Sequence, residues 1–191
     1  MKIILVRHGQ TNYNLKDLCN GLPNKKVHLT TLGKKQAHEV ASKLAKTKID
    51  IIFVSKLLRS AQTARIINRY HHVGIKFDER LNDRLMGEFE GRAASLFYAW
   101  RDKQKQPWTA IPKGGESYEN LKKRAKLFLD DLAKKDYKIV LIVTHLPIIK
   151  VMRGYFKNLS NEVMDRPDEK IIPNGKMMIF NLPKKTIKFK N

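Results

Sequence analysis

Two arginines and two histidines are the residues of this sequence best suited to chemistry on an anion. Arg7 and His8 are adjacent near the amino terminus, whereas Arg59 and His145 lie much further along the chain. Guanidinium groups hold phosphate or carboxylate oxygens by paired hydrogen bonds, and each one disfavours protonation of an imidazole beside it. A neutral imidazole nitrogen is a nucleophile that can take a phosphoryl group covalently. If the four side chains meet, they can bind and transfer phosphate.

Such a site needs no metal. The transition state of phosphoryl transfer spreads charge over three equatorial oxygens, which fixed cationic donors and the second histidine can stabilise. The sequence shows no carboxylate cluster at these positions and no Cys/His spacing that resembles a zinc site. Adjacent His71 and His72 point in different directions, so we interpret them as a helix end. We expect neither a metal nor another cofactor.

Three short apolar runs can position these residues. They cover residues 3–6, 51–54 and 139–143, are rich in β-branched side chains and lack polar alternation. Such runs are typical of strands buried on both faces of a parallel sheet.

The candidate catalytic residues follow these runs. Arg7 and His8 directly follow the first run, Arg59 comes shortly after the second, and His145 comes just after the third. Because the carboxyl ends of parallel strands line one edge of an open sheet, we expect the four side chains to converge there. Each residue alone has an ordinary explanation, such as a structural histidine, a solvated arginine or a helix cap. Their placement after three separate strands favours an active site for an anion.

Helical patterns between the strands predict a parallel sheet covered on both sides, in an α/β fold. Helices are expected from Thr30 or Thr31, over about 59–70, from near Ser117 with Tyr118 facing inward, and after Pro147. The inner face of the first helix is expected to contain Leu32, Ala37, Val40, Ala41 and Leu44. A late hairpin, with arms at 177–182 and 186–189, should lie at a sheet edge.

Residues 82–116 differ from the rest in composition. The segment holds several glycines and prolines and both tryptophans, and we expect loops and a short helix near 93–103 that cover a site. Its aromatic side chains could contact a leaving group or pack as core beneath the cover; they are Phe97, Tyr98, Trp100 and Trp108. We expect residues 1–191 to form a single domain that includes this cover segment.

Composition limits the partners and the compartment. The 191 residues include 39 Lys or Arg and 18 Asp or Glu, which gives a formal net charge of +21. This excess favours phosphorylated metabolites, nucleic acid or an acidic membrane surface. Because lysines alternate with apolar helix faces and no segment interleaves aromatic residues with Arg, we expect no specific nucleic-acid partner. Because no apolar run is long enough to span a bilayer, we expect no membrane partner. Lone Cys19 and the short apolar runs suit a soluble cytoplasmic protein. The oligomeric state stays open, with a homodimer as one option.

The ordered motifs of the chain resemble those of the histidine phosphatase superfamily, also called the phosphoglycerate-mutase-like family. The matching segments are Leu5–Thr11 with Asn14, Ser55–Ala64, Leu81–Gly91, Gly114–Ser117, Val143–His145 and Pro173–Asn174. The match spans nearly the whole chain, and the ordered set is far more specific than any one segment. The resemblance implies a three-layer α/β/α sandwich with a mostly parallel central sheet. It also implies that His8 is the nucleophile, with Arg7, Arg59 and His145 as the phosphate pocket.

The family uses an acidic residue, usually Glu, to protonate the leaving oxygen and later to activate water. The aligned residue here is Asp83, which is one methylene shorter, and a general acid must come within hydrogen-bond distance of the oxygen it serves. We favour Asp83, while Glu88 and Glu90 stay alternatives. The structural alternative to a catalytic role for Asp83 is an ordinary ion pair with Arg84 in a loop.

The flanking residues give the substrate-binding candidates. Gly9 lets the backbone approach an anion closely, and the start of a following helix can point its amides at the same anion. The full set of candidates is Gly9, Gln10, Thr11, Asn14, Arg84 and Leu146.

Together these features predict hydrolysis of phosphate monoesters on small phosphorylated metabolites. The pocket also suits a phosphoglycerate mutase, but mutases primed by a bisphosphate need extra basic residues and a closed, dry pocket. They commonly carry an insertion that this chain lacks. A basic nucleic-acid or anion-binding module on the same fold is the alternative from another class.

Overall fold

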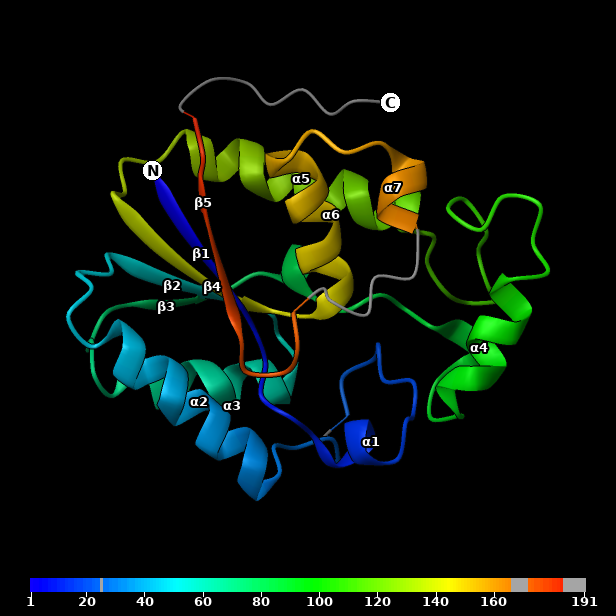
Figure 1. Ribbon diagram of the computed structural model, residues 1–191, viewed down its shortest axis with the longest axis horizontal. Coiled ribbons are helices and arrows are strands. Elements are labelled where there is room, and N and C mark those ends of the chain that lie inside the picture. The colour runs from blue at the N-terminus through cyan, green and yellow to red at the C-terminus, as the bar shows by residue number, and fades with distance from the viewer. Residues whose placement is uncertain (25, 166–171, 184–191) are drawn as a thin grey trace.

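A five-stranded sheet forms the centre of the computed structural model, which describes residues 1–24, 26–165 and 172–183 (Figure 1). Its strands are β1 (Lys2–Arg7), β2 (Ile51–Val54), β3 (Ile75–Phe77), β4 (Ile139–Thr144) and β5 (Met177–Asn181). They lie in the order β3-β2-β4-β1-β5, and neighbours run parallel except β1 and β5. The three predicted strands and the mostly parallel sheet are confirmed. The edge strand β3 was missed because its three residues, none of them buried, form no apolar run.

Helices cover both faces of the sheet, which gives the expected three-layer α/β/α sandwich (Figure 1). On one face lie α2 (Thr31–Leu44) and α3 (Leu58–Asn68), and on the other lie α5 (Tyr118–Ala133), α6 (Leu146–Phe156) and α7 (Asn161–Asp165). The connections contain α1 (Asn12–Leu15), α4 (Ala94–Arg101) and two 3₁₀ turns, Glu79–Leu81 and Gly87–Phe89. None of the described helices is long and apolar enough to cross a membrane.

Alternate residues of β1 point into two separate cores. Ile3 and Leu5 belong to the cluster that contains side chains of α5 and α6. Ile4 and Val6 belong to the cluster that contains side chains of α2 and α3. All four are at most 1% exposed, which explains why the strand reads as an unbroken apolar run.

Side-chain caps begin two helices where the sequence predicts them. The Thr30 hydroxyl accepts the backbone N–H of Gly33 at 3.0 Å, and the Ser117 hydroxyl accepts that of Asn120 at 3.1 Å. These caps satisfy N–H groups at the helix starts that have no partner within the helix, so α2 and α5 begin at fixed residues.

Two glycines allow the loop after β1 to pack against α2. A Cβ atom on Gly9 would lie 2.2 Å from the carbonyl oxygen of Gly33, and one on Gly33 would lie 2.0 Å from that of Gln10. Both clashes are with backbone, so no side-chain rotamer relieves them. The prediction that Leu32 lies on the inner face of α2 is wrong, because Gly33 occupies this contact and Leu32 is 48% exposed.

The late edge strand and the short cover helix are confirmed. β5 pairs antiparallel with β1, and α4 lies within the expected range 93–103. The turn before β5 brings Asn174 to the loop after β1, where its amide donates to the carbonyl oxygen of His8 at 3.1 Å. The expected second arm of the hairpin, 186–189, lies outside the described residues.

We predict that Gly33→Ala lowers the free energy of unfolding by about 1–3 kcal/mol, because the new methyl group overpacks a backbone contact. Chemical denaturation followed by circular dichroism measures the loss. Gly74→Ala is the matched control, because nothing lies within 4 Å of its Cβ position. It should change stability by less than about 0.5 kcal/mol. Equal losses in the two variants would contradict the packing role of Gly33.

Candidate active site

The structure brings the four predicted side chains together at the carboxyl edge of the sheet. The ring centroids of His8 and His145 are 5.0 Å apart. Arg59 enters from the first turn of α3, and Arg7 ends β1. His8, Arg59 and His145 are each at most 3% exposed. Residues distant in sequence therefore form one buried, cationic site.

One ring nitrogen of His8 carries no proton. Its Nδ1 lies 2.8 Å from the carbonyl oxygen of Gly9, and because a carbonyl only accepts, Nδ1 must carry the ring proton. The unprotonated nitrogen is then Nε2. Burial, with the charges of Arg59 and Arg7, holds the pKa of His8 well below its ordinary 6.5. The ring is therefore neutral at physiological pH, as an attacking nitrogen requires.

His145 is held by hydroxyl groups and keeps one nitrogen available. Its Nε2 lies 2.8 Å from the Ser55 hydroxyl and 3.3 Å from the Ser60 hydroxyl. Its buried Nδ1 has no hydrogen-bond partner among the described residues and lies 3.4 Å from the Asp83 carboxylate. Burial, followed by the charges of Arg59 and His8, lowers the pKa of His145 well below 6.5. This nitrogen can hydrogen-bond an oxygen of a bound anion.

Both arginines retain unused donors. The Arg7 Nη1 donates to the carbonyl oxygen of Ile172 at 3.1 Å, and the Arg59 Nη2 donates to that of Asn20 at 2.8 Å. Within the described ranges, however, the buried Nε atom of each arginine has no acceptor. A buried N–H without a partner costs about 1–3 kcal/mol, so an anion that accepts from both would be stabilised.

Asp83 lies between Arg59 and His145. Its Oδ2 accepts from Arg59 at 2.9 Å, and its Oδ1 accepts the backbone N–H of Arg84 at the same distance. Its ion pair is thus with Arg59, whereas the Arg84 guanidinium donates through Nε to the backbone carbonyl of Glu116. A carboxyl group in this position faces any phosphoryl group that the arginines hold.

The two alternative acids are engaged elsewhere. The carboxylate of Glu90 accepts the backbone N–H groups of Gly21 and Met86 at 2.8 Å each. Glu88 accepts the backbone N–H of Lys113 at 3.3 Å. Neither residue lines the cavity that contains His8. The geometry therefore favours Asp83 as the acid.

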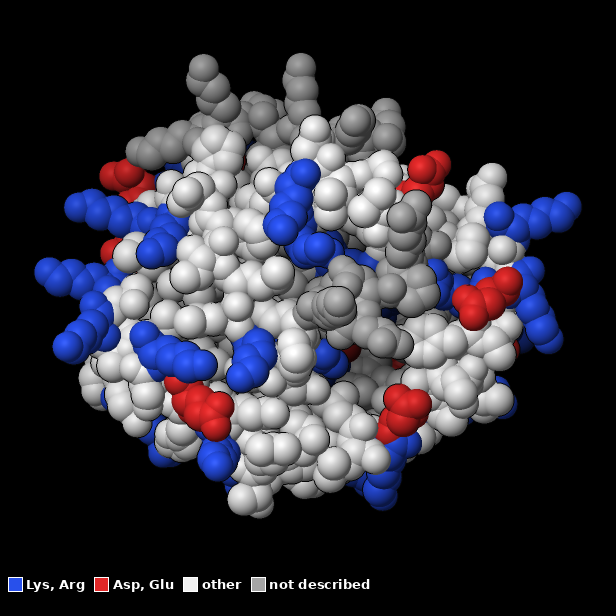
Figure 2. Space-filling view, in the orientation of Figure 1, with Lys and Arg blue, Asp and Glu red and all other residues white. Residues whose placement is uncertain are grey.

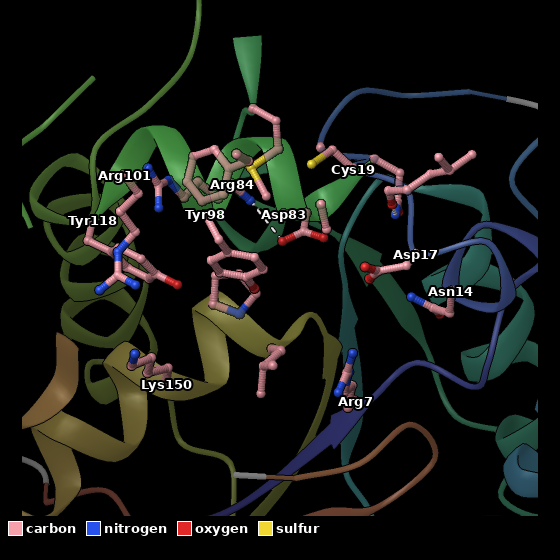
Figure 3. Close-up of a pocket in the computed structure, with 18 of the residues that line it drawn as sticks. Arg7, Asn14, Asp17, Cys19, Asp83, Arg84, Tyr98, Arg101, Tyr118 and Lys150 are labelled. Carbon is pink, nitrogen blue, oxygen red and sulfur yellow. Dashed lines mark hydrogen bonds between the residues drawn. The ribbon is translucent and has the colours of Figure 1, made fainter. Parts of the chain in front are cut away.

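A cavity of about 580 Å³ opens above these residues (Figure 3). Arg7, Asn14, Asp17 and Asp83 lie toward one side, and Arg84, Arg101, Tyr118 and Lys150 toward the other. The cavity is large enough for a small organic leaving group beside a phosphate.

The substrate-binding candidates fall into two groups. Asn14, Arg84 and Leu146 line the cavity. Gly9, Gln10 and Thr11 do not, and their backbone N–H groups donate to the side chains of Thr63, Gln36 and Asn14 at 2.9–3.1 Å. Direct substrate contact by Gly9, Gln10 and Thr11 stays a prediction.

Apart from Arg84, the residues of the far wall of the cavity were not predicted as site residues from the sequence. Arg101 and Lys150 belong to a chain with 39 basic residues, and no spacing distinguishes them. Tyr118 was expected only as an inward-facing residue of α5. It stacks on Trp108 with ring centroids 5.2 Å apart, and the Arg84 guanidinium lies 4.5 Å from its ring centroid. The cover aromatics thus serve partly as core, since Trp108 is 7% exposed.

Cys19 lines the cavity as a thiol. Burial, with the nearby carboxylates of Glu90 and Asp17, raises its pKa to about 11. A thiol of this pKa is a poor nucleophile. Within the described residues, no group of three or more His, Cys, Asp or Glu side chains is arranged to hold a metal ion.

Comparison with known proteins gives one family. The model of the histidine phosphatase superfamily (branch 1) matches residues 3–190. A provisionally named phosphoserine phosphatase 2 of Hydrogenobacter thermophilus is 34% identical over 86% of this chain and 85% of its own length. A 2,3-bisphosphoglycerate-dependent phosphoglycerate mutase of Cytophaga hutchinsonii is 31% identical over 84% of this chain and 79% of its own length. The solved structure of Bacillus stearothermophilus YhfR has the same fold, with a TM-score of 0.84 at 23% identity over 98% of this chain and 94% of that one.

The buried histidines predict a loss of stability in acid. Their pKa values lie below 6.5 in the folded chain, so below pH 6.5 the unfolded chain binds more protons than the folded one. The contribution of the two neutral histidines to the free energy of unfolding is fully present above pH 6.5. It is lost as the pH falls toward their pKa values in the folded chain, by up to about 1.4 kcal/mol per pH unit for each histidine. Urea unfolding between pH 7.5 and 5 measures this slope.

His8→Asn should reduce the dependence of the free energy of unfolding on pH by the contribution of one histidine. His38→Asn is the control, because His38 is exposed on α2, and it should leave the slope unchanged. A parental slope in His8→Asn would show that His8 is not buried in its neutral form.

Proposed function

The chain belongs to the histidine phosphatase superfamily, and we propose that it hydrolyses phosphate monoesters with His8 as the nucleophile. The observation that carries this proposal is a neutral His8, with Nε2 unprotonated, beside the buried and unused Nε donors of Arg7 and Arg59. A phosphoryl group supplies the acceptors that these donors lack and the electrophile that the imidazole can attack.

In the first step, the lone pair on His8 Nε2 attacks phosphorus and the bond to the ester oxygen breaks. Arg7, Arg59 and His145 hold the nonbridging oxygens, where the charge of the transition state gathers. Once the substrate has displaced Asp83 from its ion pair with Arg59, the carboxylate takes up a proton from solvent and gives it to the leaving oxygen, so an alcohol departs and a phosphohistidine stays. Phosphoryl oxygens that compete for Arg59 would release the Asp83 carboxyl from its ion pair and let it face the leaving group.

In the second step, Asp83 acts as a base. It takes a proton from water, whose oxygen attacks the phosphohistidine. The phosphorus–nitrogen bond breaks, inorganic phosphate leaves and His8 returns to its neutral form. Because one carboxyl group first gives and then takes a proton, the cycle ends with Asp83 protonated again.

We propose a small phosphorylated metabolite as the substrate, entering beside the cover segment 82–116 of a single domain. The cavity volume and the relative named as a phosphoserine phosphatase support this size class. Mutase activity is the second candidate, because another relative is named as a phosphoglycerate mutase. The two outcomes differ only in whether water or a bound intermediate takes the phosphoryl group from His8.

We propose no specific nucleic-acid partner, in spite of the net charge of +21. Figure 2 shows Lys and Arg spread over one face of the molecule with Asp and Glu among them, as solvated side chains are. The one cysteine of the sequence supports a reducing compartment, and we place the enzyme in the cytoplasm.

A substrate panel tests the proposed function. Released phosphate is measured with p-nitrophenyl phosphate, phosphoserine and 3-phosphoglycerate, the last with and without 2,3-bisphosphoglycerate. We expect release of phosphate from p-nitrophenyl phosphate and loss of at least about 10³-fold in His8→Ala, which should keep its circular dichroism spectrum. Full activity in His8→Ala would exclude His8 as the nucleophile. Primer-dependent isomerisation of 3-phosphoglycerate without release of phosphate would favour the mutase.

Asp83→Asn tests the acid. An amide cannot protonate a leaving oxygen, so hydrolysis of an alkyl ester such as glycerol 2-phosphate should fall by about 10²–10⁴-fold. The good leaving group of p-nitrophenyl phosphate needs little protonation, and its departure should slow far less. Steady-state and single-turnover rates on both esters give the comparison. Equal slowing of the two would point to another acid, for which Glu88→Gln and Glu90→Gln are the next variants.

A further inference from the structure

Arg124 of α5 binds the loop that carries Asp83. Its Nη1 donates to the carbonyl oxygens of Arg80 at 2.7 Å and of Asn82 at 2.8 Å, and its Nη2 donates to that of Asp83 at 3.0 Å. Its Nε and Nη2 also donate to the two carboxylate oxygens of Glu116 at 2.8 and 2.9 Å. A guanidinium group has five N–H donors, and here they meet five acceptors.

These contacts fix the backbone on both sides of Asp83. The carbonyl oxygen of Asn82 belongs to the peptide plane before the Asp83 Cα atom, and that of Asp83 belongs to the plane after it. The orientations of the two planes set the direction of the Cα–Cβ bond. Because the rigid, planar guanidinium group of Arg124 binds both carbonyl oxygens, it fixes the direction in which the Asp83 side chain leaves the backbone.

The rest of the loop is held in the same way. The hydroxyl of Thr144 donates to the carbonyl oxygen of Leu81 at 2.7 Å, so four consecutive carbonyls, 80–83, accept from side chains. The Asn82 side chain accepts the backbone N–H of Lys56 at 2.8 Å. The same loop is thereby tied to the ends of β2 and β4, which precede Arg59 and His145.

Arg124 is itself anchored. Its ion pair with Glu116 is bidentate, and the two side chains are 19% and 13% exposed. Such a pair is stronger and more directional than an exposed lysine pair. The pair leaves Arg124 little freedom to follow the loop if the loop moves.

We propose that Arg124 is the positioning residue of the general acid, setting where the Asp83 carboxyl meets the leaving oxygen. The proposal rests on the role of Asp83 given above. A short acid has two side-chain torsions, so its reach depends on the backbone more than that of a glutamate does. Arg124 supplies this constraint without contact with the substrate, since it does not line the cavity.

The test compares Arg124→Lys with the parent on an alkyl and an aryl ester. Lysine keeps the charge but cannot bind the two peptide planes and Glu116 as a planar fork. We expect the ratio of kcat/KM for glycerol 2-phosphate to that for p-nitrophenyl phosphate to fall at least about tenfold, because a misplaced acid harms only the poor leaving group. In Asp83→Asn/Arg124→Lys, the ratio should equal that of Asp83→Asn alone.

Arg80→Met is the matched control. Arg80 lies on the same loop, and its side chain pairs with Asp78 and with Asp131 of α5 rather than with the carbonyl groups on either side of Asp83. It should leave the ratio within about twofold of the parent even if the melting temperature falls. A ratio that falls equally in Arg80→Met would reduce Arg124 to a general stabilising role.

The possible failures are distinct. If Asp83→Asn leaves the ratio unchanged, the assignment of the acid is wrong. If Asp83→Asn lowers the ratio but Arg124→Lys does not, the positioning role is wrong. Should Arg124→Lys not fold, Glu116→Gln replaces it, since it weakens the anchor of Arg124 and should lower the ratio severalfold in the same direction. An unchanged ratio in folded Glu116→Gln would then overturn the proposal.

Discussion

A neutral imidazole near two guanidinium groups, that of buried Arg59 and that of half-buried Arg7, is the arrangement on which the whole site depends. Burying cations is costly unless acceptors surround them, and the described residues supply only part of the acceptors that Arg7 and Arg59 need. Burial, together with the charges of the two arginines, lowers the pKa of His8 and keeps a proton off its ring. A bound phosphoryl group relieves the unmet donors of both arginines and offers the neutral ring its electrophile. The burial and the charges that keep His8 neutral would therefore also favour a phosphoryl group as the ligand.

The fold supports this arrangement by fixing where three strands end. β1 and β4 run parallel in register, with Arg7 opposite Thr144, so the loops that follow them emerge side by side. The close contact between Gly9 and Gly33 then holds the loop after β1 against α2. Since neither contact involves a catalytic side chain, the geometry of the site is set by backbone packing before any ligand is present.

The sequence predicts the features that have a repeating physical cause. Strands buried on both faces must be apolar without interruption, and helix starts need caps. These two rules are enough to predict β1, β2, β4, α2 and α5 from the sequence. The meeting of His8 and His145 followed from parallel topology. The edge strand β3 and exposed Leu32 could not be read, because one lacks the apolar run and the other depends on a local backbone contact. Arg124 gave no signal either, since its role depends on carbonyl groups, which no sequence pattern marks.

The proposed acid, Asp83, is one methylene shorter than a glutamate, and this difference changes how its carboxyl group is positioned. A glutamate reaches its oxygen by adjusting three torsions, and ordering them costs side-chain entropy. Asp83 has one torsion fewer, so less entropy is lost, but an error in the backbone can no longer be corrected by the side chain. The hydrogen bonds that Arg124 and Thr144 donate to the four carbonyl oxygens of residues 80–83 reduce such errors, because they fix the backbone rather than the carboxylate. Among the described residues, the carboxylate accepts hydrogen bonds from Arg59 and from the Arg84 amide, and a substrate phosphate can take over part of these contacts. A fixed backbone and a carboxylate with exchangeable partners would suit the proposed role of Asp83, which is acid in the first step and base in the second, without movement of its loop.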